Sequence, residues 1–204
     1  MTKKTKQVKA WEGEFGKEYT DRNIMSPDQA DQIADNNYGN GLSRTKLNKE
    51  FLGDLNIDKI LEVGCNIANQ LVLLQREGYE NLWGIDPQEY ALEIAKKKTE
   101  KINLVKASAF DIPFKDNYFD LIFTTGVLIH IDPKDLGKAM DEMYRCSKRY
   151  ILGFEYYVPD KAQVIHHRGH DDLLWKADYA KLFLERFPDL KLVRKKILKY
   201  KNQL

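Results

Sequence analysis

Near-continuous apolar runs recur along the chain, and amphipathic segments separate them. Runs of this kind predict strands that are buried on both faces of a sheet. Six such runs are present: Lys59–Cys65, Leu82–Asp86, Ile102–Ser108, Phe119–Thr125, Tyr150–Tyr156 and Leu190–Tyr200. Strands that alternate with helices predict a doubly wound, mostly parallel sheet, so the expected fold class is α/β.

Helix signals fall between these runs. Asp132 and Asp178 can each accept a hydrogen bond from the first backbone N–H groups of a helix. Pro133 suits the first helical position. The predicted helices are Ile67–Glu77, one that begins at Pro87, one that begins at Pro133, and a last one that follows Asp178 and ends before Pro188.

The first 50 residues precede this alternation and are predicted to form a helical extension, with the doubly wound α/β domain at residues 51–204. Trp11, Phe15 and Tyr19 recur every four residues, so we expect them on one face of one helix. That face either packs the extension onto the body or belongs to a lid. A lid would exclude water from the site and carry Arg22 toward a ligand.

Ligands of doubly wound sheets bind beyond the carboxyl ends of the strands. The first strand leads into a loop with Glu62, Gly64, Asn66 and Ala68, which supplies only one of the three glycines of a dinucleotide fingerprint. This loop alone fits either a nicotinamide cofactor or a sulfonium cofactor. Asp86 ends the second strand and can accept hydrogen bonds from two ribose hydroxyls, or it can cap the next helix.

The third and fourth strands are followed by more specific patterns. Ser108-Ala109-Phe110-Asp111-Ile112-Pro113-Phe114 follows the third strand, Phe119-Asp120 opens the fourth, and Val127-Leu128-Ile129-His130 follows it. The combination resembles the class I S-adenosylmethionine-dependent methyltransferases, with their D-A-x-x-L-P-F, F-D and V-L-x-H patterns. Ser108 stands where the pattern has Asp, so the resemblance implies a hydroxyl rather than a carboxylate beside the adenine amino group.

Further motifs narrow the resemblance. The segments 11–23, 144–157 and 168–174 are similar to those of the pseudaminic acid biosynthesis-associated methylases, and the similarity covers residues 11–193. It implies a Rossmann-like fold, with residues 51–204 as a Rossmann-like methyltransferase domain. It also implies S-adenosylmethionine as the methyl donor and a small acceptor of the sugar or nonulosonic acid type, with O-methylation expected over N-methylation. The family usually continues through one more strand, so we expect this sheet to lack the final antiparallel strand.

The resemblance and the strand-end rule together assign site residues. Those expected to bind the cofactor are Glu62, Gly64, Asn66, Ala68, Asp86, Ser108, Ala109, Phe110 and Gly126. Candidate bases are His130, at the exit of the fourth strand, and Glu155, at the end of the fifth. Either residue can instead have a purely structural hydrogen-bonding role.

Acceptor recognition is expected from a second set of residues: Tyr19, Arg22, Tyr156, Arg168, His170 and Asp171. Arg168 can hold a carboxylate or phosphate through two hydrogen bonds. The His166–Asp172 cluster could also hold a divalent metal, but no Cys pair lies near it. We therefore favour acceptor recognition there and expect no metal.

Charge is unevenly distributed along the 204 residues. Residues 11–190 carry 23 basic and 31 acidic side chains, whereas both ends of the chain are basic. An acidic body disfavours nucleic-acid binding by the main surface. The C-terminal basic run, at 191–204, is interpreted as an exposed sheet edge guarded by lysines.

The location of the protein is also predicted. No apolar run is long enough to span a membrane, and no apolar segment follows the N-terminal lysines. Cys65 and Cys146 lie in apolar stretches and are expected to be free thiols. We therefore expect a cytoplasmic protein.

Two other functions remain open. A nicotinamide-dependent oxidoreductase has the same fold class, and a non-catalytic module could bind the cofactor as a sensor. Methylation of nucleic-acid base amino groups is disfavoured, because Thr125–Leu128 lacks the N/D-P-P-Y/F motif typical of those enzymes.

Overall fold

A five-stranded parallel sheet forms the centre of the molecule. The computed structural model describes residues 4–159, 162–166 and 173–201. The sheet order is β3-β2-β1-β4-β5, and every pair in it is parallel. The strands are β1 (Lys59–Val63), β2 (Asn81–Asp86), β3 (Asn103–Lys106), β4 (Phe119–Thr125) and β5 (Ser147–Phe154). The predicted α/β, Rossmann-like fold class is therefore confirmed.

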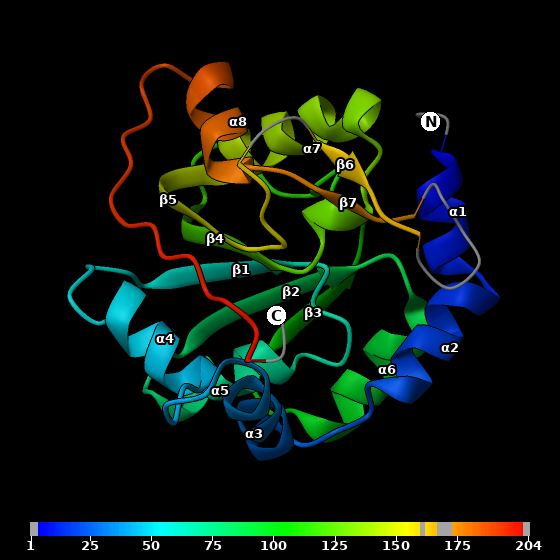
Figure 1. The fold of residues 1–204 in the computed structure, drawn as a ribbon. Coiled ribbons are helices and arrows are strands. Elements are labelled where there is room, and N and C mark those ends of the chain that lie inside the picture. The colour runs from blue at the N-terminus through cyan, green and yellow to red at the C-terminus, as the bar shows by residue number, and fades with distance from the viewer. Residues whose placement is uncertain (1–3, 160–161, 167–172, 202–204) are drawn as a thin grey trace.

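Helices cover both faces of this sheet (Figure 1). On one face lie α5 (Asn69–Arg76) and α6 (Glu89–Lys98), and on the other α7 (Pro133–Cys146) and α8 (Tyr179–Arg186). Alternate residues of β1 serve the two faces: Ile60 packs in the α5 and α6 core, and Leu61 packs in the α7 and α8 core. A short antiparallel pair, β6 (Gln163–Val164) and β7 (Trp175–Lys176), lies outside the main sheet.

The predicted helix caps are confirmed, and two helix starts are corrected. Asp132 accepts from the backbone N–H of Lys134, and Asp178 from that of Lys181. The second predicted helix begins at Glu89 rather than at Pro87, with Gln88 as its N-cap. The first begins at Asn69, since the chain before it takes left-handed conformations at Asn66 and Ala68.

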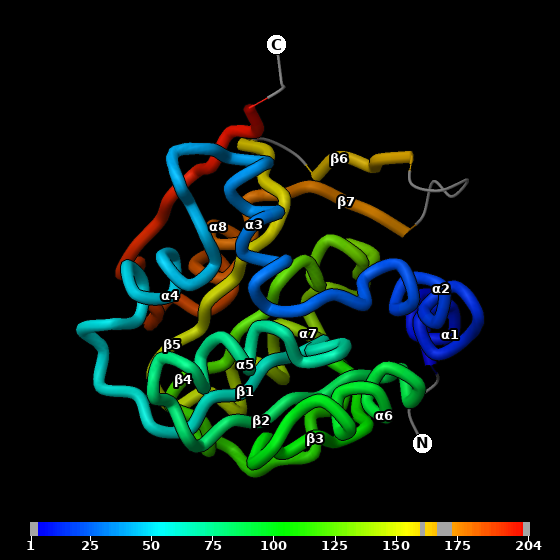
Figure 2. Tube along the Cα trace, turned by 90° about the horizontal axis from the view of Figure 1, so that it is seen from below, coloured from blue at the N-terminus to red at the C-terminus, as the bar shows by residue number. Residues whose placement is uncertain are grey.

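The prediction of a sixth strand at Leu190–Tyr200 is wrong. This segment makes no strand pairing, and it runs outside α4 toward α3 (Figure 2). Its basic side chains form ion pairs instead: Arg194 with Asp54, Lys195 with Asp178, and Lys196 with Glu50. These lysines therefore do not guard a sheet edge. They hold the segment, which we call the C-terminal strap (residues 188–201), against α4 and α8.

Four helices precede the sheet: α1 (Lys6–Glu12), α2 (Glu14–Arg22), α3 (Pro27–Tyr38) and α4 (Arg44–Leu52). The expected single helix through Trp11, Phe15 and Tyr19 is wrong, because Gly13 ends α1 and caps α2. The rings meet nevertheless, with Trp11 centred 5.1 Å from Phe15 and 5.0 Å from Tyr19. Leu52 of α4 lies in the core, and the division of the chain at residue 50 stays a prediction.

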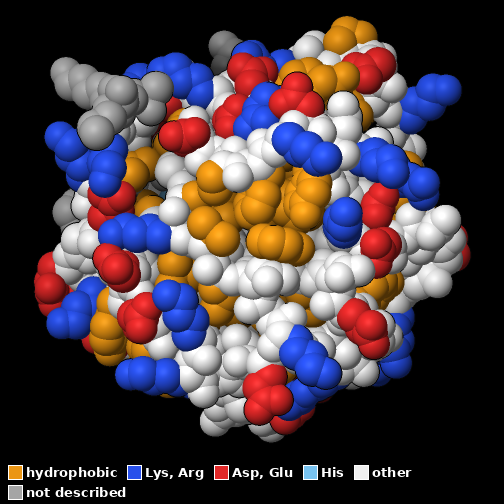
Figure 3. All heavy atoms as spheres, turned by 180° about the vertical axis from the view of Figure 1, so that it is seen from behind, with side chains coloured by type: hydrophobic (Ala, Val, Ile, Leu, Met, Phe, Trp, Pro, Cys, Tyr) orange, Lys and Arg blue, Asp and Glu red, His pale blue; other side chains and the backbone are white. Residues whose placement is uncertain are grey.

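Side-chain chemistry on the surface is mixed. Figure 3 shows a group of hydrophobic side chains at the centre of the rear face, with charged side chains around it.

Both Cys65 and Cys146 are free and buried. None of the described helices has the length and apolar character needed to cross a membrane.

Candidate functional site

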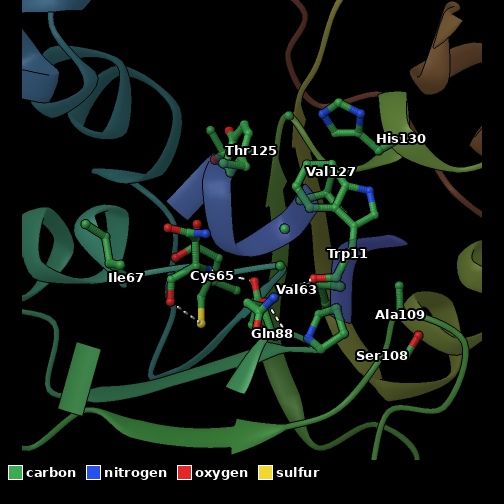
Figure 4. A pocket seen from close by; sticks show the side chains of 18 of the residues that line it. Trp11, Val63, Cys65, Ile67, Gln88, Ser108, Ala109, Thr125, Val127 and His130 are labelled. Carbon is green, nitrogen blue, oxygen red and sulfur yellow. Dashed lines mark hydrogen bonds between the residues drawn. The ribbon is translucent and has the colours of Figure 1, made fainter. Parts of the chain in front are cut away.

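A cavity of about 250 Å³ lies at the carboxyl ends of β1, β2 and β4 (Figure 4). Loops after these strands form its floor, and residues of α1, α2 and α3 close it from the other side. The position is the one expected for a ligand site in a doubly wound sheet. The lining includes Gln7, Trp11, Tyr19, Glu62, Gly64, Asn66, Gln70, Asp86, Gln88, Ser108, Ala109, Phe110, Thr125, Gly126 and His130.

The loop after β1 has an unusual backbone. Gly64, Asn66 and Ala68 have φ values of 73°, 47° and 62°, a region that favours glycine. A Cβ atom on Gly64 would lie 2.5 Å from Cγ2 of Val127. Glycine at this position therefore lets the loop after β4 approach the loop after β1.

Asp86 holds this loop in place. Its Oδ2 accepts from the backbone N–H of Asn66, and its Oδ1 accepts from that of Gln88, each at 2.8 Å. Burial raises the pKa of the Asp86 carboxyl to about 6, although these two hydrogen bonds oppose the shift. Each oxygen keeps a second lone pair, so the carboxylate can also accept from a ligand hydroxyl.

Glu62 is buried beside Asp86, with 2% of its surface exposed. Its Oε2 has no hydrogen-bond partner among the described residues. Burial raises the pKa of Glu62 well above its usual value, Asp86 raises it further, and Arg44 opposes the shift. An unsatisfied buried acceptor in a cavity wall fits a ligand that carries a donor, above all a cationic one.

The remaining predicted cofactor residues lie around the same cavity, with one exception. Ser108, Ala109, Phe110 and Gly126 all line it. Ser108 Oγ accepts from the backbone N–H of Phe110 at 3.3 Å. Ala68 is fully buried beneath the loop and does not line the cavity.

His130 lies at one end of the cavity, in the 3-10 turn η1 (Leu128–His130). Its Nδ1 is 2.6 Å from the backbone oxygen of Leu173. A carbonyl oxygen only accepts, so Nδ1 carries a hydrogen, and in the neutral ring Nε2 carries the lone pair. The Trp11 ring packs against the imidazole at a centroid distance of 4.7 Å (Figure 4).

Glu155 lies behind the loop after β4 and does not line this cavity. Its carboxylate accepts from the backbone N–H groups of Val127 at 3.1 Å and Ile129 at 3.4 Å. Burial raises its pKa to about 6. Glu155 instead lines a second cavity of about 880 Å³, between β5 and the C-terminal strap. This arrangement supports the loop that carries His130.

The predicted acceptor residues are dispersed. Tyr19 lines the first cavity. Arg22 is not part of the lining and pairs with Glu18 at 3.6 Å. Tyr156 has an exposed ring, with the Lys176 ammonium 5.6 Å from its centre. Arg168, His170 and Asp171 lie outside the described residues.

The sequence did not predict Gln88, Gln70 and Thr125, which line the cavity. Gln88 ties the N-terminal helices to the end of β2, because its Nε2 donates to the backbone oxygens of Trp11 and Gly13, each at 3.0 Å. Gln70 and Thr125 line the cavity and both accept from Arg44 of α4. These contacts join distant parts of the chain, so no local pattern signals them.

The described part of the chain holds no cluster of three His, Cys, Asp or Glu side chains placed to bind a metal ion. The sequence allows a metal site at His166–Asp172. Of these residues the structure describes only His166.

Residues 61–150 match the model of a methyltransferase domain. A demethylmenaquinone methyltransferase of Staphylococcus haemolyticus is 32% identical over 108 residues, which are 49% of this chain and 44% of that protein. An O-methyltransferase of Aspergillus nomiae is 28% identical over 91 residues, 42% of this chain and 40% of that protein. The chain thus spans less than half the length of these curated relatives.

The structural comparison extends further along the chain. An S-adenosylmethionine-dependent methyltransferase from Thermotoga maritima superposes with a TM-score of 0.58 and 18% identity, over 88% of this chain and 80% of that one. At this identity the likeness shows the fold. The chain therefore shares its Rossmann-like fold with that methyltransferase, and its residues 61–150 match a methyltransferase domain.

Proposed function

We propose that this protein is an S-adenosylmethionine-dependent methyltransferase that acts on a small molecule. The observation that carries the proposal is the cavity lined by Glu62 and Asp86, both of which lie in the segment that matches a methyltransferase domain. S-Adenosylmethionine supplies a methyl group already activated on a sulfonium sulfur.

The residues present fit this cofactor. The unpartnered Glu62 oxygen suits the ammonium of its amino-acid end. Asp86 retains lone pairs for the ribose hydroxyls. Ser108, Ala109 and Phe110 provide a small hydroxyl and apolar contacts for the adenine. The loop after β1 fits a nicotinamide cofactor as well, and the match of residues 61–150 to a methyltransferase domain favours S-adenosylmethionine.

Of the two candidate bases, the geometry supports His130. It lines the cavity, whereas both oxygens of Glu155 are engaged by backbone N–H groups behind it. The Leu173 oxygen fixes the ring with hydrogen on Nδ1. The lone pair on Nε2 would then accept the proton of an acceptor hydroxyl, while the methyl–sulfur bond breaks and S-adenosylhomocysteine leaves.

The N-terminal helices act as a lid in this proposal. Trp11 and Tyr19 line the cavity, and Gln88 holds the junction of α1 and α2 through the backbone of Trp11 and Gly13. Asn66 of the β1 loop also donates to Thr20 Oγ1 of α2 at 2.9 Å. Contacts of this kind exclude water from the reacting atoms once a ligand is bound.

The acceptor is proposed to be a sugar or nonulosonic acid intermediate, methylated on oxygen. This finer proposal rests on the resemblance of the segments 11–23, 144–157 and 168–174 to the pseudaminic acid biosynthesis-associated methylases. A cytoplasmic location is proposed as well, and it is supported by the free, buried thiols of Cys65 and Cys146.

Product analysis tests the proposal. The protein is incubated with methyl-deuterated S-adenosylmethionine and a panel of free and nucleotide-linked acidic sugars, and the products are examined by mass spectrometry. We expect one deuterated methyl group in a sugar product and an equal amount of S-adenosylhomocysteine. If the protein binds S-adenosylmethionine but forms no product from this panel or from a metabolite extract, it would be a cofactor-binding module. If it retains NADH and not S-adenosylmethionine, it would be an oxidoreductase.

The His130→Ala variant tests the assignment of the base. We expect turnover to fall about 100-fold or more, in keeping with the usual contribution of a general base. Affinity for S-adenosylhomocysteine should change little, because the ring is proposed to act on the acceptor. Calorimetry and steady-state kinetics separate the two quantities, and equal losses in both would assign His130 a positioning or folding role.

A further inference from the structure

Arg44 is a buried cation beside the proposed cofactor cavity, with 7% of its surface exposed. It is the first residue of α4, after the N-cap Ser43. Its guanidinium carbon lies 4.1 Å from the centre of the Phe154 ring, and burial lowers its pKa to about 10. Charged side chains are seldom buried to this extent, because losing water costs free energy unless partners replace it.

Two hydrogen bonds connect Arg44 to the cavity wall. Its Nε donates to Oε1 of Gln70 at 2.9 Å, and its Nη2 donates to Oγ1 of Thr125 at 3.2 Å. Gln70 lies in the first turn of α5 and Thr125 ends β4, so Arg44 connects the start of α5 to the end of β4. Both partners line the cavity, whereas Arg44 lies behind them.

These bonds fix which hydrogen-bonding groups remain for a ligand. A guanidinium only donates, so it orients the Gln70 amide with its oxygen toward Arg44 and leaves the NH₂ group as a donor. Thr125 Oγ1 accepts from Arg44, which leaves its single hydrogen to donate. Neither group donates a hydrogen bond within the described part of the chain.

The surrounding charges extend the pattern. Arg44 lies within electrostatic reach of the carboxyl groups of Glu62, Glu155 and Asp31. Glu62 presents its unpartnered acceptor oxygen to the same cavity. The cavity wall thus has hydrogen-bond donors next to the positive charge of Arg44 in one part and the acceptor oxygen of Glu62 in another. This arrangement complements the carboxylate and the ammonium of an α-amino acid.

We propose that Arg44 is a positioning residue that presents Gln70 and Thr125 as hydrogen-bond donors to a carboxylate group bound in the cavity. The carboxylate can come from the amino-acid end of S-adenosylmethionine, and in that case the inference rests on the proposed function. It can also come from the methyl acceptor.

Calorimetry with S-adenosylmethionine and its decarboxylated analogue tests the first source. Wild-type protein is expected to bind the carboxylate-bearing form about 10-fold or more tightly, as expected for charge-assisted hydrogen bonds. Gln70→Glu keeps the oxygen that accepts from Arg44 but replaces the NH₂ donor, so it should abolish this preference without removing the partner of the buried cation. Arg44→Met should abolish the preference as well.

A matched control is Arg76→Met. Arg76 lies at the other end of α5, and its ion pair with Asp28 also ties α3 to the body. This variant should keep the wild-type preference, which separates loss of the donors from loosening of the N-terminal helices. Melting temperatures of all variants show which of them remain folded.

The second source is tested with N-acetylneuraminate and its methyl ester, titrated in the presence and absence of S-adenosylhomocysteine. A preference for the acid in the wild type that Gln70→Glu removes assigns the donors to the acceptor's carboxylate. The inference is overturned if Gln70→Glu leaves both preferences at wild-type size, or if the wild type shows neither preference. Absence of any S-adenosylmethionine binding contradicts the proposed function instead, and the acid and ester pair then tests the donors alone.

Discussion

Asp86 combines a structural role with its proposed role in binding ribose. Its two oxygens accept from Asn66 and Gln88, and thereby fix the loop after β1 and the entry of α6. The alternatives weighed for Asp86, helix entry and ligand binding, are compatible, since a carboxylate has lone pairs for both. To separate the two roles, Asp86 must be compared with a carboxylate that also accepts from two backbone N–H groups but does not line the cavity.

Asp120 provides that comparison at the opposite end of the sheet, where it accepts from the backbone N–H groups of Asp58 and Lys59 at 3.1 Å. We expect Asp86→Ala to weaken S-adenosylhomocysteine binding about 10-fold or more, the usual effect of losing hydrogen bonds to a charged group. Asp120→Ala should lower the midpoint of urea unfolding and leave the affinity unchanged. Calorimetry and urea titration on both variants check this, and equal affinities would refute the ribose role.

At the scale of residues, the sequence permits prediction of side chains at the end of a strand or just beyond it. Glu62, Asp86 and Ser108 reach the cavity because parallel strands end at one edge of the sheet. Arg44 could not be predicted in this way, because its contacts with Gln70 and Thr125 span 26 and 81 residues. Its burial depends on how α4 packs, which no local pattern determines.

At the scale of elements, local signals predict caps and buried strands, and they fail where tertiary pairing decides. Asp132 and Asp178 cap helices through neighbouring backbone groups, so the sequence suffices. Leu190–Tyr200 has the apolar content of a strand, but it forms no ladder. Three of its basic side chains instead pair with acidic residues on α4, just after α4 and at the N-cap of α8. The break at Gly13 divides the predicted aromatic helix and still lets its rings meet.

The proposed lid is tested by Trp11→Ala. Trp11 contacts Phe15, Tyr19 and His130, so its removal should loosen α1 over the cavity. We expect S-adenosylhomocysteine to dissociate faster, which stopped-flow fluorescence measures. Its affinity should fall about 5-fold or more, within the range for losing packed aromatic contacts.

Phe187→Ala is the control for this variant. Phe187 stacks on Tyr144 at 4.0 Å, and neither ring lines the first cavity. Its loss should lower stability without changing the dissociation rate. A Trp11→Ala variant that releases the ligand at the wild-type rate would show that α1 only packs against the body.

At the scale of the whole molecule, the basic C-terminal residues and acidic body are complementary. The strap is held to the body by ion pairs, so its charge offers no argument for nucleic-acid binding.

The buried carboxyl groups at and near the site have raised pKa values. Burial raises the pKa of Asp86 and Glu155 to about 6, and that of Glu62 well above its usual value.

These raised pKa values predict how stability depends on pH. Between about pH 4 and pH 6 the folded protein binds more protons at these groups than the unfolded chain does, so the free energy of unfolding should fall as pH rises through this window. For Asp86 alone the limit is about 3 kcal/mol, at about 1.4 kcal/mol for each pKa unit. Carboxyls with lowered pKa, such as Asp178, lose their contribution only at lower pH.

Urea unfolding of the ligand-free protein at pH 5, 6, 7 and 8 measures this dependence. The midpoint should fall between pH 5 and pH 7, and the fall should be smaller in Asp86→Asn. A midpoint that rises over the same interval would mean that the buried carboxyls are not held protonated.

Titration of S-adenosylhomocysteine into the purified protein tests the central claim most directly. The account predicts binding to one site per chain, competition by S-adenosylmethionine, no competition by NADH, and about 10-fold or greater weakening in Asp86→Ala. Binding of NADH with no binding of S-adenosylhomocysteine or S-adenosylmethionine would contradict it.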